Sequence, residues 1–403
     1  MSQGERGTAD GSDGRPRRRS RMGCLLSRPY ELSPRLLRDL EAASEGTAHS
    51  QHHLVPPRPV RHELGWSDLS SVQLISASGG SCDVFAAVLD GESVAVKRVK
   101  SNAADAVRDL RAEAALLEEL GTSKPHQHII RLIATGTDGD GLPFIVLERL
   151  VNTLADELPK PGVRALDDLP TEPDEVSWCE CAVVASRWPL LRGLHVAYQL
   201  ALALRHLHDG EALPRTRVLH RDLKPDNVGF LPDGCLVLFD FGLATRWEVS
   251  SKGEGAAGEV AEEARALTGQ TGSTRYMAPE VALCQPYSGR AEVFSFGTIL
   301  WQMCAHERPF RGFSVADFER RVARGGERPA IPRKWPPALR ELVRDCWRPE
   351  PTERPGFGQV VSRLEGLLRA QLHARTASRA RVERSPKEVL VEVVGEMAPV
   401  VTD

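Results

Sequence analysis

Two polar motifs flank one predicted β-hairpin, one just before its first strand and one just after its second. Their residue types suit proton and phosphate chemistry. The motifs are His-Arg-Asp-Leu-Lys-Pro-Asp-Asn at 220–227 and Asp-Phe-Gly at 240–242. Between them, two apolar runs flank a Pro-Asp-Gly turn, which is typical of a hairpin. The hairpin brings Asp222, Asn227 and Asp240 together, so one carboxylate can accept a proton from a hydroxyl group while the others hold Mg²⁺ against phosphate oxygens. The alternative, that these are ordinary polar loop residues, leaves both motifs and the hairpin unexplained.

The elements that must position these motifs form a strand-rich part followed by a helix-rich part. From Trp66 the apolar residues alternate, which indicates strands. The expected elements are a hairpin of 84–89 and 93–99, a helix over 102–120, strands over 129–136 and 144–150, a buried helix over 194–208, and the hairpin of 228–231 and 236–239. Residues 155–190 are rich in proline and acidic residues and are interpreted as a variable connection.

The composition supports a folded core and excludes several other classes of protein. The 403 residues are 41% hydrophobic and 27% charged, with a formal net charge of −3. This charge gives no global attraction to nucleic acid, and no stretch approaches the ~20 apolar residues of a membrane span. The eight cysteines are scattered, and only Cys179 and Cys181 lie close together. We therefore expect reduced thiols, a cytoplasmic location and no binding of nucleic acid.

The two ends of the chain lack the patterns of a packed core. Residues 1–65 carry a basic run at 15–21 and are expected to be a disordered basic leader, and residues 371–403 a poorly ordered tail. Within the leader, the residues from Met22 to Ser27 fit an N-myristoylation motif at Gly23 beside a palmitoylatable Cys24. Acylation, and with it membrane binding, requires that translation start at Met22 or that the leader be removed.

The two motifs resemble those of the eukaryotic protein kinase family, and the resemblance extends over about residues 68–370. It implies a bilobal α+β protein kinase fold, with ATP and Mg²⁺ bound between the lobes. It also implies that Asp222 is the catalytic base, that Lys224 contacts the γ-phosphate, and that Asn227 and Asp240 are Mg²⁺ ligands.

Features nearer the carboxyl end indicate which branch of the kinase family the sequence resembles. Ala278-Pro279-Glu280 closes an activation segment in the family manner, and the resemblance implies a buried structural pair between Glu280 and Arg354. Cys346-Trp347 ahead of Arg354-Pro355 resembles the tyrosine-kinase-like branch. Lys224-Pro225 and Gly272-Ser273 resemble serine/threonine kinases, which implies protein substrates with serine or threonine acceptors.

Lys97, in the strand-rich part, provides an independent check of the resemblance to protein kinases. Ala95 and Lys97 alternate on a predicted strand and so share one face, which suits an adenine ring beside Ala95 and phosphates beyond it. Glu113 is the expected partner of Lys97. Leu110 and Leu117 lie three and four residues from it, which places Glu113 on the apolar face of its helix.

The loop expected to cover the phosphates departs from the family pattern. By register with Val84, only Gly79 stands at a family glycine position, and Cys82 replaces another glycine. Glycines there let backbone N–H groups approach phosphate. Cys82 is interpreted as a tolerated substitution, with crowding of the phosphates or a reactive thiol near ATP as alternatives.

The hinge and two further departures complete the expected site. The resemblance implies that the carbonyl of Glu148 and the N–H of Leu150 face the adenine base. Gly229 replaces the leucine that usually lies beneath adenine, so we expect a looser floor. Glu292 replaces an aspartate that anchors the catalytic loop, and we expect this hydrogen bond to survive a small shift.

The activation segment between Asp240 and Glu280 is long and its middle lacks a core pattern. In kinases with an arginine before the base, a phosphate on this segment pairs with that arginine, so Arg221 is the expected tie. Thr268 and Thr271 are the expected acceptors for an upstream kinase. The alternative is that a nearby acidic run replaces the phosphate.

The sequence therefore predicts a protein serine/threonine kinase domain over 66–370, with a first lobe over about 66–150 and a second over about 151–370. The alternatives are a catalytically impaired pseudokinase that binds ATP as a scaffold, motivated by Cys82 and Glu292, and a small-molecule kinase of the same fold.

Overall fold

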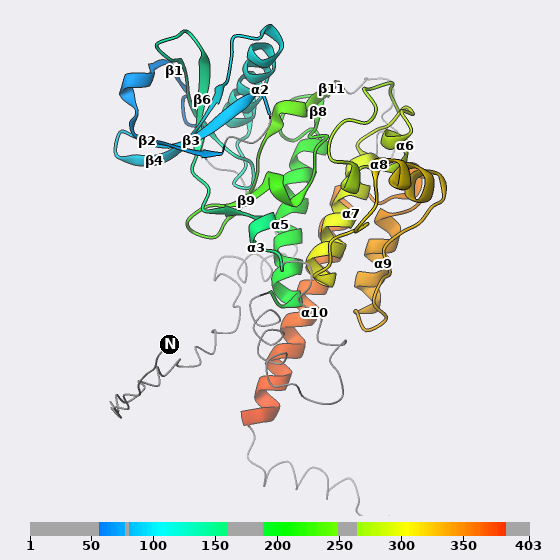
Figure 1. Cartoon of the computed structure of the whole chain (residues 1–403). Coiled ribbons are helices and arrows are strands. Elements are labelled where there is room, and N and C mark those ends of the chain that lie inside the picture. Colours follow the sequence, from blue (N-terminus) through cyan, green and yellow to red (C-terminus); the bar gives the residue numbers. More distant parts are fainter. Residues whose placement is uncertain (1–55, 77–79, 160–187, 249–263, 384–403) are drawn as a thin grey trace, which may run out of the picture.

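The computed structural model of the protein describes residues 56–76, 80–159, 188–248 and 264–383. They form a strand-rich lobe with one long helix and a mainly helical lobe (Figure 1). The first lobe comprises β1 (Arg61–Gly65), β2 (Ser70–Ser76), β3 (Cys82–Leu89), β4 (Glu92–Val99), α2 (Ala104–Ser123), β5 (Leu132–Thr137) and β6 (Pro143–Glu148), with a short η2 turn (Trp66–Asp68). Its six-stranded sheet has the order β1-β5-β6-β4-β3-β2.

The central hairpin of this sheet sets the direction of the site residues. β3 and β4 are antiparallel, with Val84 opposite Lys97, and β4 pairs with β6 so that Ala95 lies opposite Leu147. Opposed residues share a face, and so do residues two apart on one strand. Val84, Ala95, Lys97 and Leu147 therefore line one face of the sheet.

The expected start of the domain at residue 66 is wrong by one strand. β1 pairs in parallel with β5 and forms an edge of the sheet, and Leu64 is 4% exposed. A Cβ at Gly136 would lie 2.0 Å from the carbonyl oxygen of Leu64, so the close contact of β1 with β5 requires glycine there. The strand escaped the sequence pattern because Leu64 is its only buried residue.

The second lobe is helical apart from three short strand pairs. Its elements are β7 (Asn152–Thr153), α3 (Leu154–Glu157), α5 (Leu190–His208), β8 (Thr216–Leu219), η4 (Pro225–Asn227), β9 (Val228–Phe230), β10 (Leu236–Leu238), η5 (Phe241–Leu243), β11 (Thr245–Glu248), η6 (Thr274–Tyr276), α6 (Pro279–Ala282), α7 (Arg290–Ala305), α8 (Val315–Asp317), η7 (Phe318–Arg324), α9 (Pro337–Cys346), η8 (Pro351–Glu353) and α10 (Phe357–Glu383).

Helix α5 forms the centre of the core, as its sequence periodicity predicts. Leu194, Ala197, Ala201 and Leu204 are fully buried, and Figure 1 shows α5 between the β9 hairpin and helices α7 and α10. The core that surrounds α5 extends into the first lobe through α2 and β6, so the two lobes share one apolar cluster. The catalytic motifs lie at the edge of this cluster, so its close packing holds them in place.

The expected tail boundary at residue 371 is also wrong, because α10 continues to Glu383. Its last turns are rich in alanine and arginine, which favour helix without an apolar stripe, so no periodic pattern revealed them. The acylation motif at 22–27 and most of the predicted connection at 155–190 lie outside the described residues. Within the described part of the chain, no helix has the length and apolarity needed to cross a membrane.

Candidate active site

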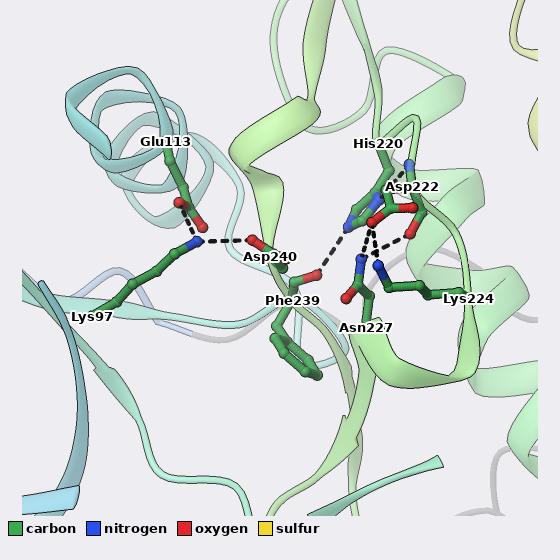
Figure 2. A network of polar contacts seen from close by, with 8 residues as sticks. All are labelled: Lys97, Glu113, His220, Asp222, Lys224, Asn227, Phe239 and Asp240. Atoms are coloured by element: carbon green, nitrogen blue, oxygen red, sulfur yellow. Dashed lines mark hydrogen bonds and ion pairs between the residues drawn. The ribbon is translucent and has the colours of Figure 1, made fainter. Parts of the chain in front are cut away.

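The predicted hairpin of β9 and β10 is present and carries one motif at each end. Val228 pairs with Leu238 and Phe230 with Leu236. The backbone N–H of Phe239 also donates to the carbonyl of Asn227 at 3.0 Å, which ties the two ends together. As predicted, the hairpin brings Asn227 and Asp240 to one side of the molecule (Figure 2).

Asp222 is the centre of the first polar group (Figure 2). Lys224 Nζ donates to Asp222 Oδ2 at 2.6 Å, and Asn227 Nδ2 donates to the same oxygen at 3.0 Å. The other carboxylate oxygen, Oδ1, is buried and has no hydrogen-bond partner among the described residues. Gly272, with a φ of +94°, lies beside it, and a Cβ there would be 3.2 Å from Oδ1. Asp222 thus has one oxygen held in place and one left to accept a proton.

Lys97 is the centre of the second polar group and joins three elements. Its Nζ donates to Glu113 Oε2 on α2 at 2.7 Å and to Asp240 Oδ1 after β10 at 2.8 Å. Gly242 lies directly beside this cluster, since a Cβ there would be in ordinary van der Waals contact with both acidic oxygens at 3.6 Å. The predicted pair of Lys97 with Glu113 is therefore present, and Lys97 also connects the first lobe to the Asp-Phe-Gly motif.

Burial and charge act in opposite directions in this cluster. Burial favours the neutral form of Lys97, but the two carboxylates outweigh it and raise the pKa of the lysine. Burial likewise opposes ionisation of Asp240, yet Lys97 holds the pKa of that carboxyl below its ordinary value. Burial raises the pKa of Glu113, which is 3% exposed. Removing the lysine would leave Glu113 as an uncompensated buried group.

A third group anchors the backbone of the catalytic loop to α7. Glu292 Oε1 accepts a hydrogen bond from the backbone N–H of Arg221 at 2.6 Å, and Oε2 contacts His208 Nε2 at 2.5 Å. The expected bond from Glu292 to the loop is therefore present in spite of the longer side chain. His208 was predicted only as a buried residue of α5, because helical spacing reveals burial and not the carboxylate that meets it.

The predicted Mg²⁺ ligands offer oxygen donors. Asn227 commits its amide nitrogen to Asp222, so the oxygen is the atom it offers to a ligand. Asp240 uses Oδ1 for Lys97, and its side chain is 41% exposed. Hard oxygen donors suit Mg²⁺, so these residues fit the ion.

The face of the sheet that carries Val84 and Ala95 continues to Lys97, as the predicted nucleotide site requires. Gly79 lies outside the described residues. Cys82 begins β3, and burial raises the pKa of its thiol, which disfavours the reactive thiolate. This supports the interpretation of Cys82 as a tolerated substitution.

The structure has no open space at Gly229, the position where a looser floor is expected. A Cβ at Gly229 would lie 2.5 Å from Leu150 Cδ1 and 3.2 Å from Phe239 Cε1. The side chain of Leu150, which follows β6 and Glu148, therefore fills the space that a larger residue at 229 would take. This contact joins residues distant in the sequence, and no local pattern could have revealed it.

The part of the activation segment that the structure describes after residue 263 meets the catalytic loop through Arg221. Arg221 NH1 donates to Thr268 Oγ1 at 2.9 Å, and its Nε donates to the carbonyl of Leu243 at 2.6 Å. Thr268 is exposed, whereas the hydroxyl of the half-buried Thr271 donates to the carbonyl of Thr268 at 2.8 Å. Of the two expected acceptors, Thr268 is the one beside Arg221.

The predicted structural pair of Glu280 and Arg354 is present. Arg354 donates to the two oxygens of Glu280 at 2.6 and 2.9 Å, and the arginine is 1% exposed. This bidentate buried pair holds the end of the activation segment against the second lobe.

This architecture and these motifs define the protein kinase class, and comparison with known proteins agrees. Residues 77–364 match the model of the protein kinase domain family. The chain therefore belongs to the eukaryotic protein kinase family.

Its relatives include serine/threonine-protein kinases, a serine/threonine/tyrosine-protein kinase and a dual specificity protein kinase, and they support the resemblance to the tyrosine-kinase-like branch. The chain is 32% identical to the serine/threonine-protein kinase STY17 of Arabidopsis thaliana over 44% of its own length and 27% of that protein. It is 28% identical to the serine/threonine-protein kinase mos of Xenopus laevis over 84% of its length and 86% of mos. It spans only about a third of the probable serine/threonine-protein kinase drkC of Dictyostelium discoideum, with 26% identity.

Proposed function

We propose that this protein transfers the γ-phosphoryl group of ATP to serine or threonine hydroxyls of protein substrates in intracellular signalling. The observation that carries the proposal is the pair of polar groups that meet beside the β9–β10 hairpin. Asp222 keeps one buried oxygen without a partner, and Lys97 holds Asp240 and Glu113 at 2.8 and 2.7 Å. Oriented groups of this kind act by positioning and charge neutralisation.

In this mechanism Asp222 orients the acceptor hydroxyl and takes its proton. The O–H bond of the acceptor breaks, its oxygen bonds to the γ-phosphorus, and the bond to the β-phosphate oxygen breaks to release ADP. Lys224 and Lys97 offset the negative charge of the phosphates. Asn227 and Asp240 would hold Mg²⁺, which when bound neutralises phosphate charge.

The nucleotide would lie against the face of the sheet that carries Val84 and Ala95. The backbone of Glu148 and Leu150 would pair with adenine, while the Leu150 side chain supplies its floor beside Gly229. We include Gly79 in this site on the strength of the family resemblance alone.

The proposal includes regulation by a phosphate on Thr268, added by an upstream kinase. Arg221 already contacts the Thr268 hydroxyl at 2.9 Å, so a phosphate there would form charge-assisted hydrogen bonds with the same guanidinium. We also propose a cytoplasmic location, which the free thiols of the five described cysteines support.

The pseudokinase alternative, which the altered glycine loop and Glu292 motivate, has no support from the described residues. Glu292 holds the backbone of Arg221, and burial disfavours the thiolate of Cys82. No observation favours a scaffold over an enzyme.

The test is a transfer assay with the purified full chain, labelled ATP, Mg²⁺ and casein or myelin basic protein. We expect label on phosphoserine and phosphothreonine, and loss of transfer when EDTA removes the metal. Label that persists with EDTA, or that appears only on tyrosine, would contradict the proposal.

A further inference from the structure

A groove of about 400 Å³ lies on the second lobe, away from the nucleotide site, between the end of α7, the loop that follows it, and the loop that follows η7. Its walls include the aromatic side chains of Trp301, Phe310 and Phe313. Trp301 Nε1 donates to the carbonyl of Ala330 at 2.9 Å, which fixes one wall against the other. The groove is large enough for one or two apolar side chains of a partner.

The charged lining of the groove is positive on balance, with three arginines and two glutamates. Arg308, Arg311 and Glu307 are exposed, and within the described part of the chain none of the three forms an ion pair. Glu327, a carboxylate of the same groove, is taken up by Arg321 through two bonds of 2.7 and 2.8 Å. Residues 307–348 hold eleven arginines or lysines and six acidic residues, although the whole chain has a net charge of −3. An acidic partner is therefore favoured here.

Arg328 also lines the groove, and its charge is only partly compensated, by the nearby charge of Glu280 and by the ring of Phe294 at 4.8 Å. Its NH1 donates only to the carbonyls of Val322 and Glu327, and its buried Nε has no partner among the described residues. Burial and the nearby charge of Arg354 lower the pKa of Arg328 to about 10. A carboxylate that entered the groove would reduce this cost.

The groove contacts residues 272–280, which resemble the protein-substrate platform of the kinase family. Arg275, which follows Ser273 in the activation segment, donates through NH1 to the carbonyls of Pro309 and Phe310 at 2.8 and 2.9 Å. Tyr276 likewise donates to Gln302 of α7 at 2.6 Å. A chain that presents its hydroxyl to Asp222 across this platform can therefore reach the groove with a neighbouring segment.

We propose that this groove is a docking site for an acidic segment of the protein substrate. One aromatic or aliphatic side chain of the segment would pack against Trp301 and Phe310, and flanking carboxylates would pair with Arg308 and Arg311. The identity of the occupant as substrate rests on the proposed function, whereas the chemistry of recognition does not. Docking outside the catalytic cleft raises the local concentration of the acceptor hydroxyl.

The first experiment measures binding without catalysis, on the full chain in the absence of ATP. The probe is a fluorescein-labelled peptide with one phenylalanine flanked on each side by three glutamates. Its binding is measured by fluorescence anisotropy. Arg308→Glu and Arg311→Glu should each weaken binding by about tenfold or more, the effect of losing one interfacial ion pair. Arg344→Glu is the matched control, because Arg344 is exposed on α9 and does not line the groove. It should change binding by less than about twofold.

Three results would overturn the docking site: no measurable binding, equal loss in Arg344→Glu, or equal binding of a peptide whose glutamates are replaced by glutamine. Thermal melting of each variant checks that the fold is intact. Because Arg308 and Arg311 are exposed, their replacement should leave the melting temperature unchanged.

The second experiment separates docking from catalysis. A serine peptide fused to the acidic segment should show a lower KM than the serine peptide alone, with the same kcat, and Arg311→Glu should remove this difference without affecting the unfused peptide. If anisotropy shows the expected pattern but no peptide is phosphorylated, the docking site stands and the proposed function fails. If the fused and unfused peptides are phosphorylated with the same KM, only the assignment of the occupant as a substrate segment fails.

Discussion

At the scale of single residues, the site depends on side chains held by partners both near and distant in the chain. Asp222 is fixed by the nearby Lys224 and Asn227, and Lys97 is fixed by two carboxylates from different elements. Motif spacing predicted the group around Asp222, and helical spacing predicted the pair of Lys97 with Glu113, but the contact of Lys97 with Asp240 was not predicted. Nor did spacing predict the contact of Leu150 with Gly229 or of His208 with Glu292, since both arise only when separate elements pack.

The floor of the nucleotide site gives a prediction at this scale. Gly229→Leu should push Leu150 out of its position, because even a Cβ would lie 2.5 Å from Leu150 Cδ1. We expect KM for ATP to rise by about tenfold, which corresponds to ~1.4 kcal/mol of lost binding. The double variant Gly229→Leu with Leu150→Ala should recover most of this loss, because the new leucine then replaces the old one. Failure of the double variant to recover would mean that Leu150 does not form the floor.

Glu292 gives a second residue-scale prediction, in the dependence of stability on pH. Burial opposes its ionisation, but the hydrogen bond from His208 lowers the pKa of Glu292 below its ordinary 4.5. A carboxyl whose pKa is lowered by folding contributes stability that is complete above its ordinary pKa of 4.5 and is lost as the pH falls through the lowered pKa. Glu292→Gln should therefore cost about 1–3 kcal/mol at pH 7 and less at pH 3. Urea unfolding at both pH values measures this, and an equal cost at both would contradict it.

At the scale of elements, the activation segment gives the clearest prediction. Treatment with phosphatase should remove most activity, and incubation with ATP or an upstream kinase should restore it. Thr268→Ala should block recovery, because Arg221 contacts the Thr268 hydroxyl. Thr271→Ala is the matched control and should still recover, since the Thr271 hydroxyl donates to the carbonyl and hydroxyl oxygens of Thr268, while the hydrogen bond from Arg221 goes to Thr268. Full activity in the Thr268→Ala variant would favour the alternative in which acidic residues replace the phosphate.

Strand β1 gives a prediction about the extent of the domain. A chain beginning at residue 66 should melt at a lower temperature than one beginning at residue 56, because it loses the buried Leu64 and the pairing of β1 with β5. Burial of one leucine contributes about 1.5–3 kcal/mol, so we expect a decrease of several degrees in Tm. Equal melting temperatures for the two chains would show that β1 adds nothing to the first lobe.

The elements also show what sequence patterns can and cannot reveal. The hairpins, α2 and α5 were predicted because apolar residues repeat at the period of a strand or a helix where one face is buried. β1 buries one residue and the end of α10 carries no apolar stripe, so neither has a period to detect. Propensity and edge pairing, which act without a pattern, decide these elements.

At the scale of the whole molecule, one ion-pair cluster and one shared core connect the two lobes. Lys97 on β4 reaches Glu113 on α2 and Asp240 at the end of the hairpin, so the position of each element depends on the others. The proposed docking groove is connected to this framework through Arg275 of the activation segment, which donates a hydrogen bond to the carbonyl of Pro309. Nucleotide, acceptor hydroxyl and docking segment would thus meet on one framework.

The most direct test of this account is Asp222→Asn, assayed for both transfer and nucleotide binding in the full chain. Asparagine keeps the size of the side chain but removes the oxygen that accepts the proton, so kcat should fall by about 10²–10⁴-fold. Affinity for Mg²⁺-ATP, measured by calorimetry, should stay within about threefold, because Asp222 is not among the proposed metal or nucleotide ligands. Transfer equal to that of the unaltered chain would contradict the account.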